Sequence, residues 1–490
     1  MHFSIPDTQE CTDHNGSNYT GFNIHINGEY HCTVRYKQLF NLHEQLKKFN
    51  GNELNFPPFP PKKYLPLTPN QLEDRRSLLE KYIQAVGQST SLINLDLFYA
   101  FLLTAQQEST GERVREVEID VFLMNGYKIT VSASSNERSY SILEKACSQI
   151  NLPNPYVYYF SLFLILREEN GELTIIRKLQ DFESPYISQK NIAGNLKIML
   201  RKSYWDPEYD LELMHDRVSL NLLYVQTVSD IEKRWILCGK NTREQLAILQ
   251  ARGAKKEYLD VARNLRYYGY VQFKECICDY PTPDSKVVVS AGQRELNLRI
   301  EVPGGEIKDR SFKVTRMRCW RITTHNDIIE TDVQTVLQKD PQLDLSFEYL
   351  MSKDNLQWIT ITSEQAILMA VCLQSIVDEL LLKKSGAKFK QVNLTPIMFS
   401  VDLPRDFRNG SFSYMKRDGS SQVINLSQSS SEDTLSSSPN GTMRLGRSEP
   451  TMSMKKLSEK LSNLTNRNSS NTRQPLVEND AFEGIGDEDL

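Results

Sequence analysis

Residues 56–67 leave the chain little conformational choice, because they read Phe56-Pro57-Pro58-Phe59-Pro60-Pro61-Lys62-Lys63-Tyr64-Leu65-Pro66-Leu67. Proline fixes its own φ and restricts the preceding residue to extended conformations, so this stretch is predicted to be a polyproline-like loop. The next residues, Thr68-Pro69-Asn70-Gln71, are those of a helical capping box with proline at the first helical position. A helix is therefore expected to begin here and run to about Val86, and a further helical stretch to Ala105.

Upstream of this loop, apolar and polar residues alternate on both sides of Asn27-Gly28. The alternating apolar positions are Phe22, Ile24, Ile26, Tyr30, Cys32 and Val34. Two runs of period two around Asn-Gly predict a tight β-hairpin. Apolar residues at spacings of three and four then predict a helix over 39–49. The expected order is a small sheet, a helix, the proline-rich loop and more helices.

The middle of the chain repeats the change from strand to helix periodicity. Residues 117–131 alternate around Asn125-Gly126, and a helix near 141–150 with strands near 160–166, 173–176 and 196–200 completes a ββαββ-like unit. The period is helical over 220–267. Strands are expected at 271–278, 287–290, 296–302, 312–323, 345–351 and 358–362, followed by a helix over 364–384. Beyond Ser385, Ser, Asn and Asp replace the apolar clusters, which predicts a disordered tail.

Composition excludes several classes of protein. The 490 residues carry 58 Lys and Arg against 62 Asp and Glu, a formal net charge of −4, which argues against a nucleic-acid binder. The longest apolar run, 157–166, is half the roughly 20 residues that a membrane-spanning helix needs. The first residues lack the basic and apolar regions of a signal peptide. A soluble cytosolic protein is therefore expected.

Motifs for catalysis are missing from the sequence. It contains no phosphate-binding P-loop, GxGxxG, GxSxG, HExxH or kinase signature, and the seven histidines have no metal-ligand spacing. Eight scattered cysteines include no CxxC pair, so neither a disulfide scaffold nor a zinc site is expected. We therefore expect no enzymatic activity, no cofactor and no metal.

Three short pieces in the first 109 residues carry a positive signal. These are Arg35-Tyr36-Lys37-Gln38-Leu39, Phe59-Pro60-Pro61-Lys62, and Arg75-Arg76 followed by Leu79. In this order and spacing they resemble the motifs of PX (phox homology) domains. The resemblance implies a pocket for phosphatidylinositol 3-phosphate. In that pocket Arg35 would bind the 3-phosphate, Tyr36 would pack under the inositol ring, Lys62 would contact the phosphodiester and Arg75 the ring hydroxyls.

The chemistry of these residue types fits such a pocket, since Arg offers a bidentate fork to phosphate and Lys a mobile point charge. Residues 1–109 contain nine Lys and Arg against eleven Asp and Glu, so overall charge would not attract an anionic membrane. The alternative is that Arg35 and Arg75 are ordinary surface charges. Residues 64–67 could enter the lipid interface or pack against the domain's own helix.

Two further stretches, 222–231 and 258–270, are similar to landmarks of the middle lobe of FERM modules. The three-lobe FERM order fits residues 114–385, and PX followed by FERM is typical of a small subfamily of sorting nexins. The resemblance implies an α+β multidomain fold, in which the PX domain is a three-stranded sheet plus helices. Its expected domains are PX (1–109), a ubiquitin-like lobe (114–202), a helical lobe (203–270), a PTB/PH-like lobe (271–385) and the tail (386–490).

The third lobe of this subfamily takes up NPxY or NxxY receptor tails by strand addition, which implies the same partners here. The strand over 316–323 is the candidate edge, because Arg318 and Arg321 lie on both sides of an otherwise apolar strand. Trp320 belongs to the same strand, although a plain core tryptophan is the alternative. Leu350, Met351 and the final helix would complete the groove.

The last residues, 481–490, keep Phe482 and Ile485 in a tail otherwise poor in apolar residues, as a linear docking motif does. The resemblance implies that this end binds the retriever/commander recycling complex with Leu490 as anchor, whereas mere solubilising acid is the alternative. Asn479-Asp480-Ala481-Phe482 also has the form NxxF. We hypothesise that the tail folds back, places this tetrapeptide in the third-lobe groove and competes with cargo. The alternative is a chance match.

Together these features predict a cytoplasmic cargo adaptor, peripheral on the early endosome membrane, that returns receptors to the cell surface. Two alternatives remain open from the sequence. A lipid-modifying enzyme could use a PX domain for targeting, and a FERM-type linker could join membrane to actin.

Overall fold

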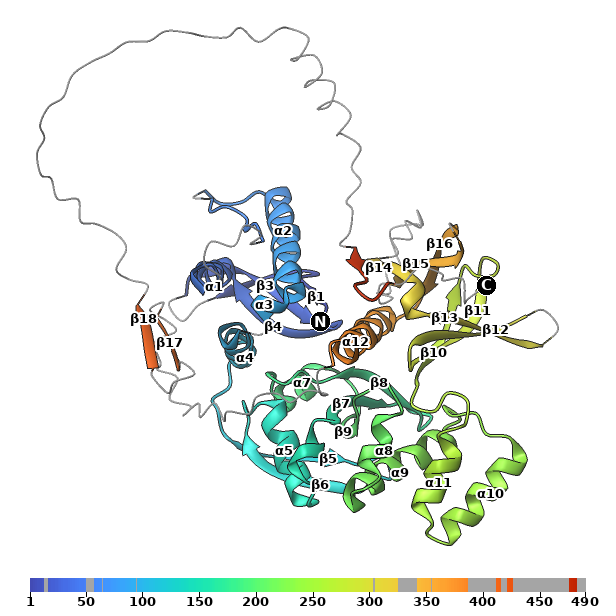
Figure 1. Ribbon diagram of the computed structural model, residues 1–490. Coiled ribbons are helices and arrows are strands. Elements are labelled where there is room, and N and C mark those ends of the chain that lie inside the picture. The colour runs from blue at the N-terminus through green and yellow to red at the C-terminus, as the bar shows by residue number, and fades with distance from the viewer. Residues whose placement is uncertain are drawn as a thin grey trace, which may run out of the picture. The chain divides into compact units, whose positions relative to one another are not determined.

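The computed structural model describes residues 1–12, 16–49, 57–63, 65–93, 95–302, 305–324, 342–353, 355–386, 411–415, 421–425 and 476–482. The chain divides into two compact units, one of residues 1–393 with 475–490 and one of residues 394–474. Figure 1 shows the helices and strands of the first unit in chain order, from blue to red. No helix among these residues is both long and apolar enough to cross a lipid bilayer.

The N-terminal part is a small sheet covered by helices, as the sequence predicts. Its elements are β1 (Phe3–Ser4), β2 (Thr8–Thr12), β3 (Asn18–Ile26), β4 (Glu29–Arg35), α1 (Tyr36–Phe49), α2 (Pro69–Gln88), α3 (Thr90–Ile93) and α4 (Asp96–Thr110). The short strands β1 and β2 pair with one edge of β3, and β4 pairs with β3 as well. Pro6 lies between β1 and β2, and it has no backbone N–H to donate to the sheet. The sheet that was predicted to have three strands therefore has four, because two short strands, β1 and β2, occupy one edge of β3 in place of a single strand.

Local signals in this part are confirmed. Asn27 and Gly28 both have positive φ, 52° and 92°, as a two-residue hairpin turn of this kind requires. The Thr68 side chain accepts a hydrogen bond from the backbone N–H of Gln71, and the Gln71 side chain accepts one from the Thr68 backbone N–H. The capping box therefore begins α2 at Pro69.

A ubiquitin-like lobe follows. It consists of β5 (Glu116–Phe122), β6 (Lys128–Ser134), α5 (Ser139–Gln149), α6 (Asn154–Val157), β7 (Phe160–Arg167), β8 (Leu173–Lys178), α7 (Pro185–Asn191) and β9 (Leu196–Lys202). The five strands have the order β6-β5-β9-β7-β8, with β5 and β9 parallel. Alternating residues of β5 and β6, such as Ile119, Val121 and Val131, are buried, and they share one core with Ile142 of α5.

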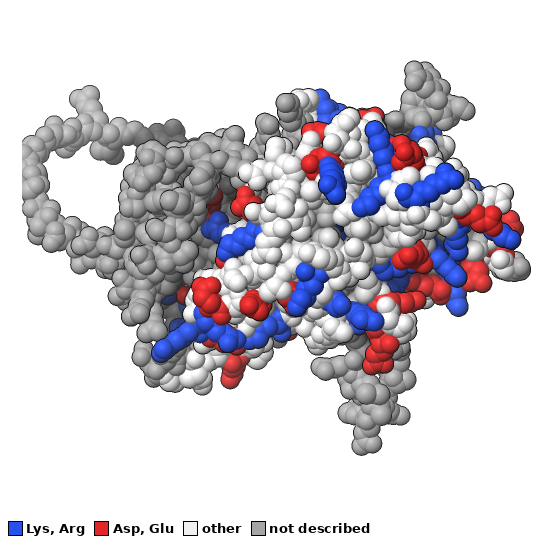
Figure 2. All heavy atoms as spheres, turned by 90° about the horizontal axis from the view of Figure 1, so that it is seen from below, with Lys and Arg blue, Asp and Glu red and all other residues white. Residues whose placement is uncertain are grey.

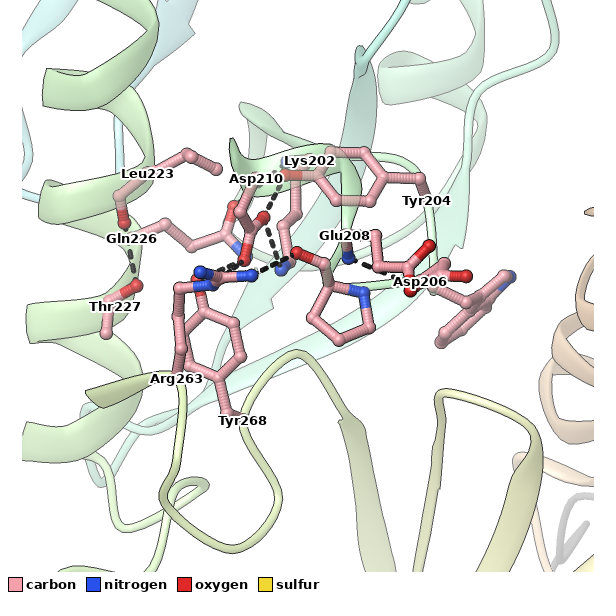
Figure 3. A network of polar contacts seen from close by, with 12 residues as sticks. Lys202, Tyr204, Asp206, Glu208, Asp210, Leu223, Gln226, Thr227, Arg263 and Tyr268 are labelled. Carbon is pink, nitrogen blue, oxygen red and sulfur yellow. Dashed lines mark hydrogen bonds and ion pairs between the residues drawn. The ribbon is translucent and has the colours of Figure 1, made fainter. Parts of the chain in front are cut away.

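The next part is a helical lobe of α8 (Tyr209–Leu213), α9 (Arg217–Glu232), α10 (Lys240–Ala251) and α11 (Lys255–Ala262). Its most buried charge is Asp210 of α8, which is fully buried. The Asp210 carboxylate accepts hydrogen bonds from Tyr204 and from Tyr268 (2.8 Å) and forms ion pairs with Arg263 (3.2 Å) and Lys202 (3.5 Å), as Figure 3 shows. Because these partners come from the end of β9, the lobe itself and the segment before the third lobe, Asp210 connects all three.

The third lobe is a large antiparallel sheet closed by one helix. Its elements are β10 (Val271–Cys278), β11 (Ser285–Gly292), β12 (Glu295–Glu301), β13 (Ile307–Lys313), the 3₁₀ turn η1 (Val314–Arg316), β14 (Met317–Thr324), β15 (Leu343–Ser352), β16 (Asn355–Thr362) and α12 (Ala366–Lys384). The helix packs against β14, β15 and β11. The single strand expected over 312–323 is wrong, because η1 divides it into β13 and β14.

Most of the predicted disordered tail lies outside the described residues. Within residues 394–474, β17 (Ser411–Met415) and β18 (Ser421–Asn425) form an antiparallel pair. Nearer the end of the chain, β19 (Val477–Glu478) joins the third lobe and completes the order β13-β12-β11-β10-β16-β15-β14-β19. Without β19, β14 is the edge of the sheet.

Candidate functional site

A cluster of cations and aromatic rings lies where α1, the proline-rich loop and α2 meet. The Arg75 guanidinium lies 4.4 Å from the centre of the Tyr36 ring, and the Lys62 ammonium lies 4.0 Å from the centre of the Phe40 ring. The rings of Tyr36 and Phe40 are stacked, with centroids 6.3 Å apart. The structure thus brings together three of the four residues predicted to bind lipid, Tyr36, Lys62 and Arg75, and adds Phe40.

The proline-rich loop is held in place by its own aromatic residue. Phe59 packs on His43 and on Tyr82, each at 4.8 Å between ring centroids, and also contacts Tyr36. The Tyr36 hydroxyl donates a 2.7 Å hydrogen bond to the carbonyl oxygen of Pro60. These contacts fix the backbone immediately before Lys62, so that its cation is presented beside the rings.

Arg35, the fourth predicted residue, is the last residue of β4, directly before Tyr36. Its backbone N–H donates to the Gln38 side chain at 2.8 Å, and its guanidinium lies 3.4 Å from the centre of the Tyr19 ring. Tyr19 of β3 is a residue that sequence reasoning missed. The motif names Arg35 but gives no indication of which ring across the sheet its side chain covers.

The second candidate site is the β14 edge of the third lobe, where residues 477–482 of the tail bind in the same chain. Val477 pairs with Trp320 and Glu478 with Cys319 in antiparallel register. The Asn479 backbone N–H donates to the Arg318 carbonyl at 3.0 Å. This contact is the strand addition that the NxxF hypothesis requires.

Asn479 ends the added strand and is buried, with 6% of its surface exposed. Its side-chain amide donates to the carbonyl oxygens of Val314 (2.9 Å) and Met317 (2.6 Å). Its side-chain oxygen accepts from the N–H of Ala481, and its carbonyl accepts from the N–H of Phe482, both at 3.0 Å. Residues 479–482 therefore form a reverse turn. The side-chain amide of its first residue, Asn479, is hydrogen-bonded to main-chain carbonyl groups.

The residues predicted to bind cargo differ in where their side chains lie. Trp320 is 2% exposed and belongs to the core, so only its backbone pairs with the tail and its side chain forms no open pocket. Arg318 offers its carbonyl while its side chain forms an ion pair with Glu348. The Arg321 guanidinium lies 4.7 Å from the ring centre of Trp358.

Of the predicted groove residues, Met351 is partly buried and packs against the core of this lobe, and Leu350 is buried but does not belong to that core cluster. The carbonyls of Val314 and Met317 are functional groups that the sequence analysis missed. Val314 is the first residue of η1 and Met317 directly follows it. The only sequence signal for that turn was the length of the 12-residue strand expected there.

Of the three tail residues predicted to bind the recycling complex, Phe482 is described. It is partly buried, and its N–H closes the reverse turn at Asn479. Ile485 and Leu490 lie outside the described residues. The same short segment thus carries both the turn in the groove and the start of the predicted docking motif.

Positive and negative side chains are mixed on the face of the molecule that Figure 2 shows. In the view of Figure 2, Lys and Arg alternate with Asp and Glu over the visible face, and neither sign forms a broad patch. This face therefore has no strong long-range attraction for an anionic membrane. Cations held at one place, such as Lys62 and Arg75, are the groups that could bind a phosphate here.

Comparison with known proteins matches successive parts of the chain to four family models. Models of four families match: PX domain (residues 22–105), the F1 lobe of sorting nexins 17, 27 and 31 (117–205), the F2 lobe of sorting nexins 17 and 31 (206–266) and the sorting nexin 17 FERM C-terminal domain (269–381). Sorting nexin-17 of Danio rerio is 45% identical over 502 residues, with 100% of both chains covered. The chain belongs to the sorting nexin-17 family.

Other relatives agree with this assignment. Sorting nexin-17 of Homo sapiens is 44% identical over 499 residues and 100% of both chains, and sorting nexin-31 of Homo sapiens is 36% identical over 78% of this chain and 86% of that protein. The PX and FERM resemblance derived from the motifs is therefore confirmed. As a sorting nexin-17 family member with a PX domain and three FERM lobes, the chain is an endosomal sorting adaptor.

Proposed function

We propose that this chain links phosphatidylinositol 3-phosphate on early endosomes to NPxY or NxxY signals in receptor tails and returns those receptors to the cell surface through the retriever complex. The observation that carries the proposal is the β14 edge, which accepts an added strand ending in a buried asparagine. A receptor tail with the same asparagine, in an extended segment, can make the same main-chain contacts.

Asparagine is the residue that best satisfies the hydrogen-bond acceptors of this groove. The carbonyls of Val314 and Met317 are acceptors only, and a side-chain amide supplies two N–H donors at one position. Aspartate has no donor when ionised, and alanine would leave both carbonyls unpaired in a buried place. The residue three positions later lies where Phe482 lies in the tail, so tyrosine or phenylalanine at that position of a cargo is expected to fit.

The lipid half of the proposal depends on the PX cluster. Lys62 and Arg75 supply two cations that lie on aromatic rings, a placement that limits their side-chain freedom before any ligand arrives. Arg35 supplies a third cation next to Tyr36 in sequence. A phosphorylated inositol ring bound by these groups would receive charge-assisted hydrogen bonds, which are the strong ones for phosphate.

Cargo and tail would compete for one groove. When a receptor tail occupies the β14 edge, residues 477–482 are displaced, and Phe482, at the start of the predicted docking segment, becomes accessible. We therefore expect cargo binding to expose the retriever-docking end of the chain. Exchange of this kind couples loading of the adaptor to recruitment of the recycling machinery.

Co-sedimentation with vesicles tests the lipid half. Arg35→Ala should bind vesicles containing phosphatidylinositol 3-phosphate about ten- to a hundredfold more weakly than the wild type, since loss of one charged phosphate contact costs about 1.5–3 kcal/mol. Lys48→Ala, which removes an exposed positive charge from the end of α1, is the matched control and should bind as the wild type does. Equal binding by Arg35→Ala and the wild type would remove Arg35 from the pocket.

A further inference from the structure

The PX domain and the ubiquitin-like lobe meet at a buried contact surface. This surface, called the seam below, is formed by residues of α4 and β4 in the PX domain and by residues 182–188 of the lobe. Phe182, which follows β8, belongs to the hydrophobic core of the PX domain rather than to that of its own lobe. Its ring is stacked on Tyr99 of α4, with centroids 5.0 Å apart and an interplanar angle of 17°, and it meets His31 of β4 edge-on at 5.9 Å. A fully buried aromatic anchor of this kind is typical of a stable interface.

Across the same seam, one side chain of the PX domain both accepts and donates a hydrogen bond. Gln106 of α4 is fully buried: its side-chain oxygen accepts from the Ser184 N–H at 2.8 Å, and its side-chain amide donates to the Ser188 hydroxyl at 2.9 Å. One PX side chain thus satisfies two groups of the neighbouring lobe. Separating the domains would leave all of these groups to find new partners.

A buried ion pair lies beside these contacts. Arg177 donates two hydrogen bonds to Glu183, at 2.5 and 2.6 Å, and both side chains are almost completely buried. Burial alone would raise the pKa of Glu183, but Arg177 outweighs it and the pKa is lowered. Burial raises the pKa of Glu29 in the PX hairpin, and the charge of Arg177 partly offsets that rise. The cation therefore interacts with a carboxylate from each domain.

The tip of the same hairpin reaches the third lobe. A Cβ atom built on Gly28 would lie 3.5 Å from Cδ1 of Ile367, so the turn between β3 and β4 packs against α12. The N-terminus is tied to this turn, since the His2 N–H donates to the Asn27 side chain (2.9 Å) and the Asn27 N–H to the His2 carbonyl (2.8 Å). Burial lowers the pKa of the Met1 ammonium, and the charge of Asp378 in α12 partly offsets that fall.

We propose that the PX domain is a fixed fourth lobe of the FERM-like module, held because its β3–β4 hairpin is wedged between the ubiquitin-like lobe and α12. The domain does not swing on the linker that follows α4. Because α12 also packs against β14, the edge that receives the tail, the lipid cluster and the peptide groove belong to one body. Resting on the proposed function, this means that the spacing between membrane and cargo is fixed before either binds.

The distance between the two ends of this body tests the proposal without lipid or peptide. Paramagnetic labels are introduced on unnatural amino acids at exposed Lys81 of α2 and exposed Lys308 of β13 in the full chain, and their distance distribution is measured by pulsed electron spin resonance. The wild type should give one narrow distribution. A broad distribution in the wild type would overturn the proposal. Since no ligand is present, this result is independent of the proposed lipid and cargo specificity.

Variants of the seam complete the test. Phe182→Ala should widen the Lys81–Lys308 distribution at least twofold, while a second label pair within the FERM-like module, at Glu244 and Lys308, stays narrow. Tyr127→Ala, which removes an exposed ring of the ubiquitin-like lobe, is the control and should change neither distribution.

If Phe182→Ala also widens the Glu244–Lys308 distribution, the variant has disturbed the FERM-like module itself. The test then uses Gln106→Ala, which removes the two hydrogen bonds that the PX domain makes to Ser184 and Ser188. This variant should widen the Lys81–Lys308 distribution alone. Unchanged Lys81–Lys308 widths in the folded seam variants would mean that the hairpin wedge does not hold the domain.

Discussion

Asn479→Ala should raise the affinity of the full chain for a free NPxY peptide by about tenfold or more, because it removes three side-chain hydrogen bonds that are worth about 0.5–1.5 kcal/mol each. The tail is a tethered competitor, and flexible tethers give effective concentrations that reach the millimolar range. Weakening the tail therefore frees the groove without altering it. Isothermal titration with the peptide measures the change, and a chain ending at Gln474 sets the upper limit of the gain.

Asp480→Ala is the matched control for this experiment. Asp480 is the next residue, and it is exposed while Asn479 is buried. Its removal should leave the peptide affinity at the wild-type value. If Asn479→Ala and the wild type bound the peptide equally well, residues 477–482 would not compete with cargo, whatever their place at rest.

Asp210→Asn should destabilise the three FERM lobes by about 3–5 kcal/mol, the usual cost of removing one partner of a buried ion pair. The carboxylate is fully buried and is the shared acceptor for Tyr204, Tyr268, Arg263 and Lys202. An amide has the same shape, but it leaves both cations without a counter-charge. The loss should appear as a lower midpoint of urea-induced unfolding.

A surface aspartate distinguishes this effect from a general loss of charge. Asp260 of α11 is exposed, so Asp260→Asn should change stability by no more than about 0.5 kcal/mol. A change of less than about 1 kcal/mol in Asp210→Asn would mean that water or other groups compensate the cations, and that the network does not fasten the lobes.

Local signals in the sequence were strong where a few neighbouring residues determine the conformation. Asn27-Gly28 predicted the hairpin turn, and Thr68-Pro69-Asn70-Gln71 predicted the start of α2, because each pattern acts through backbone geometry within four residues. The NxxF pattern belongs to the same class. A four-residue turn with an asparagine at its first position can be recognised without knowledge of the rest of the fold.

Contacts between distant parts of the chain could not be predicted in this way. Trp320 alternates correctly for an edge strand, but its side chain lies in the core because α12 covers that face of the sheet. Nothing near Phe182 in sequence indicates that its ring enters the PX core. Likewise, Tyr19 contacts Arg35 only because β3 and β4 pair. Such contacts depend on the tertiary arrangement rather than on local pattern.

Binding to vesicles that carry both phosphatidylinositol 3-phosphate and a lipid-anchored NPxY peptide tests the account most directly. Two sites on one chain make the second contact intramolecular, so the wild type should bind these vesicles at least about tenfold more tightly than vesicles with either ligand alone. An affinity no higher than that for the better single ligand would contradict the claim that one chain joins membrane and cargo.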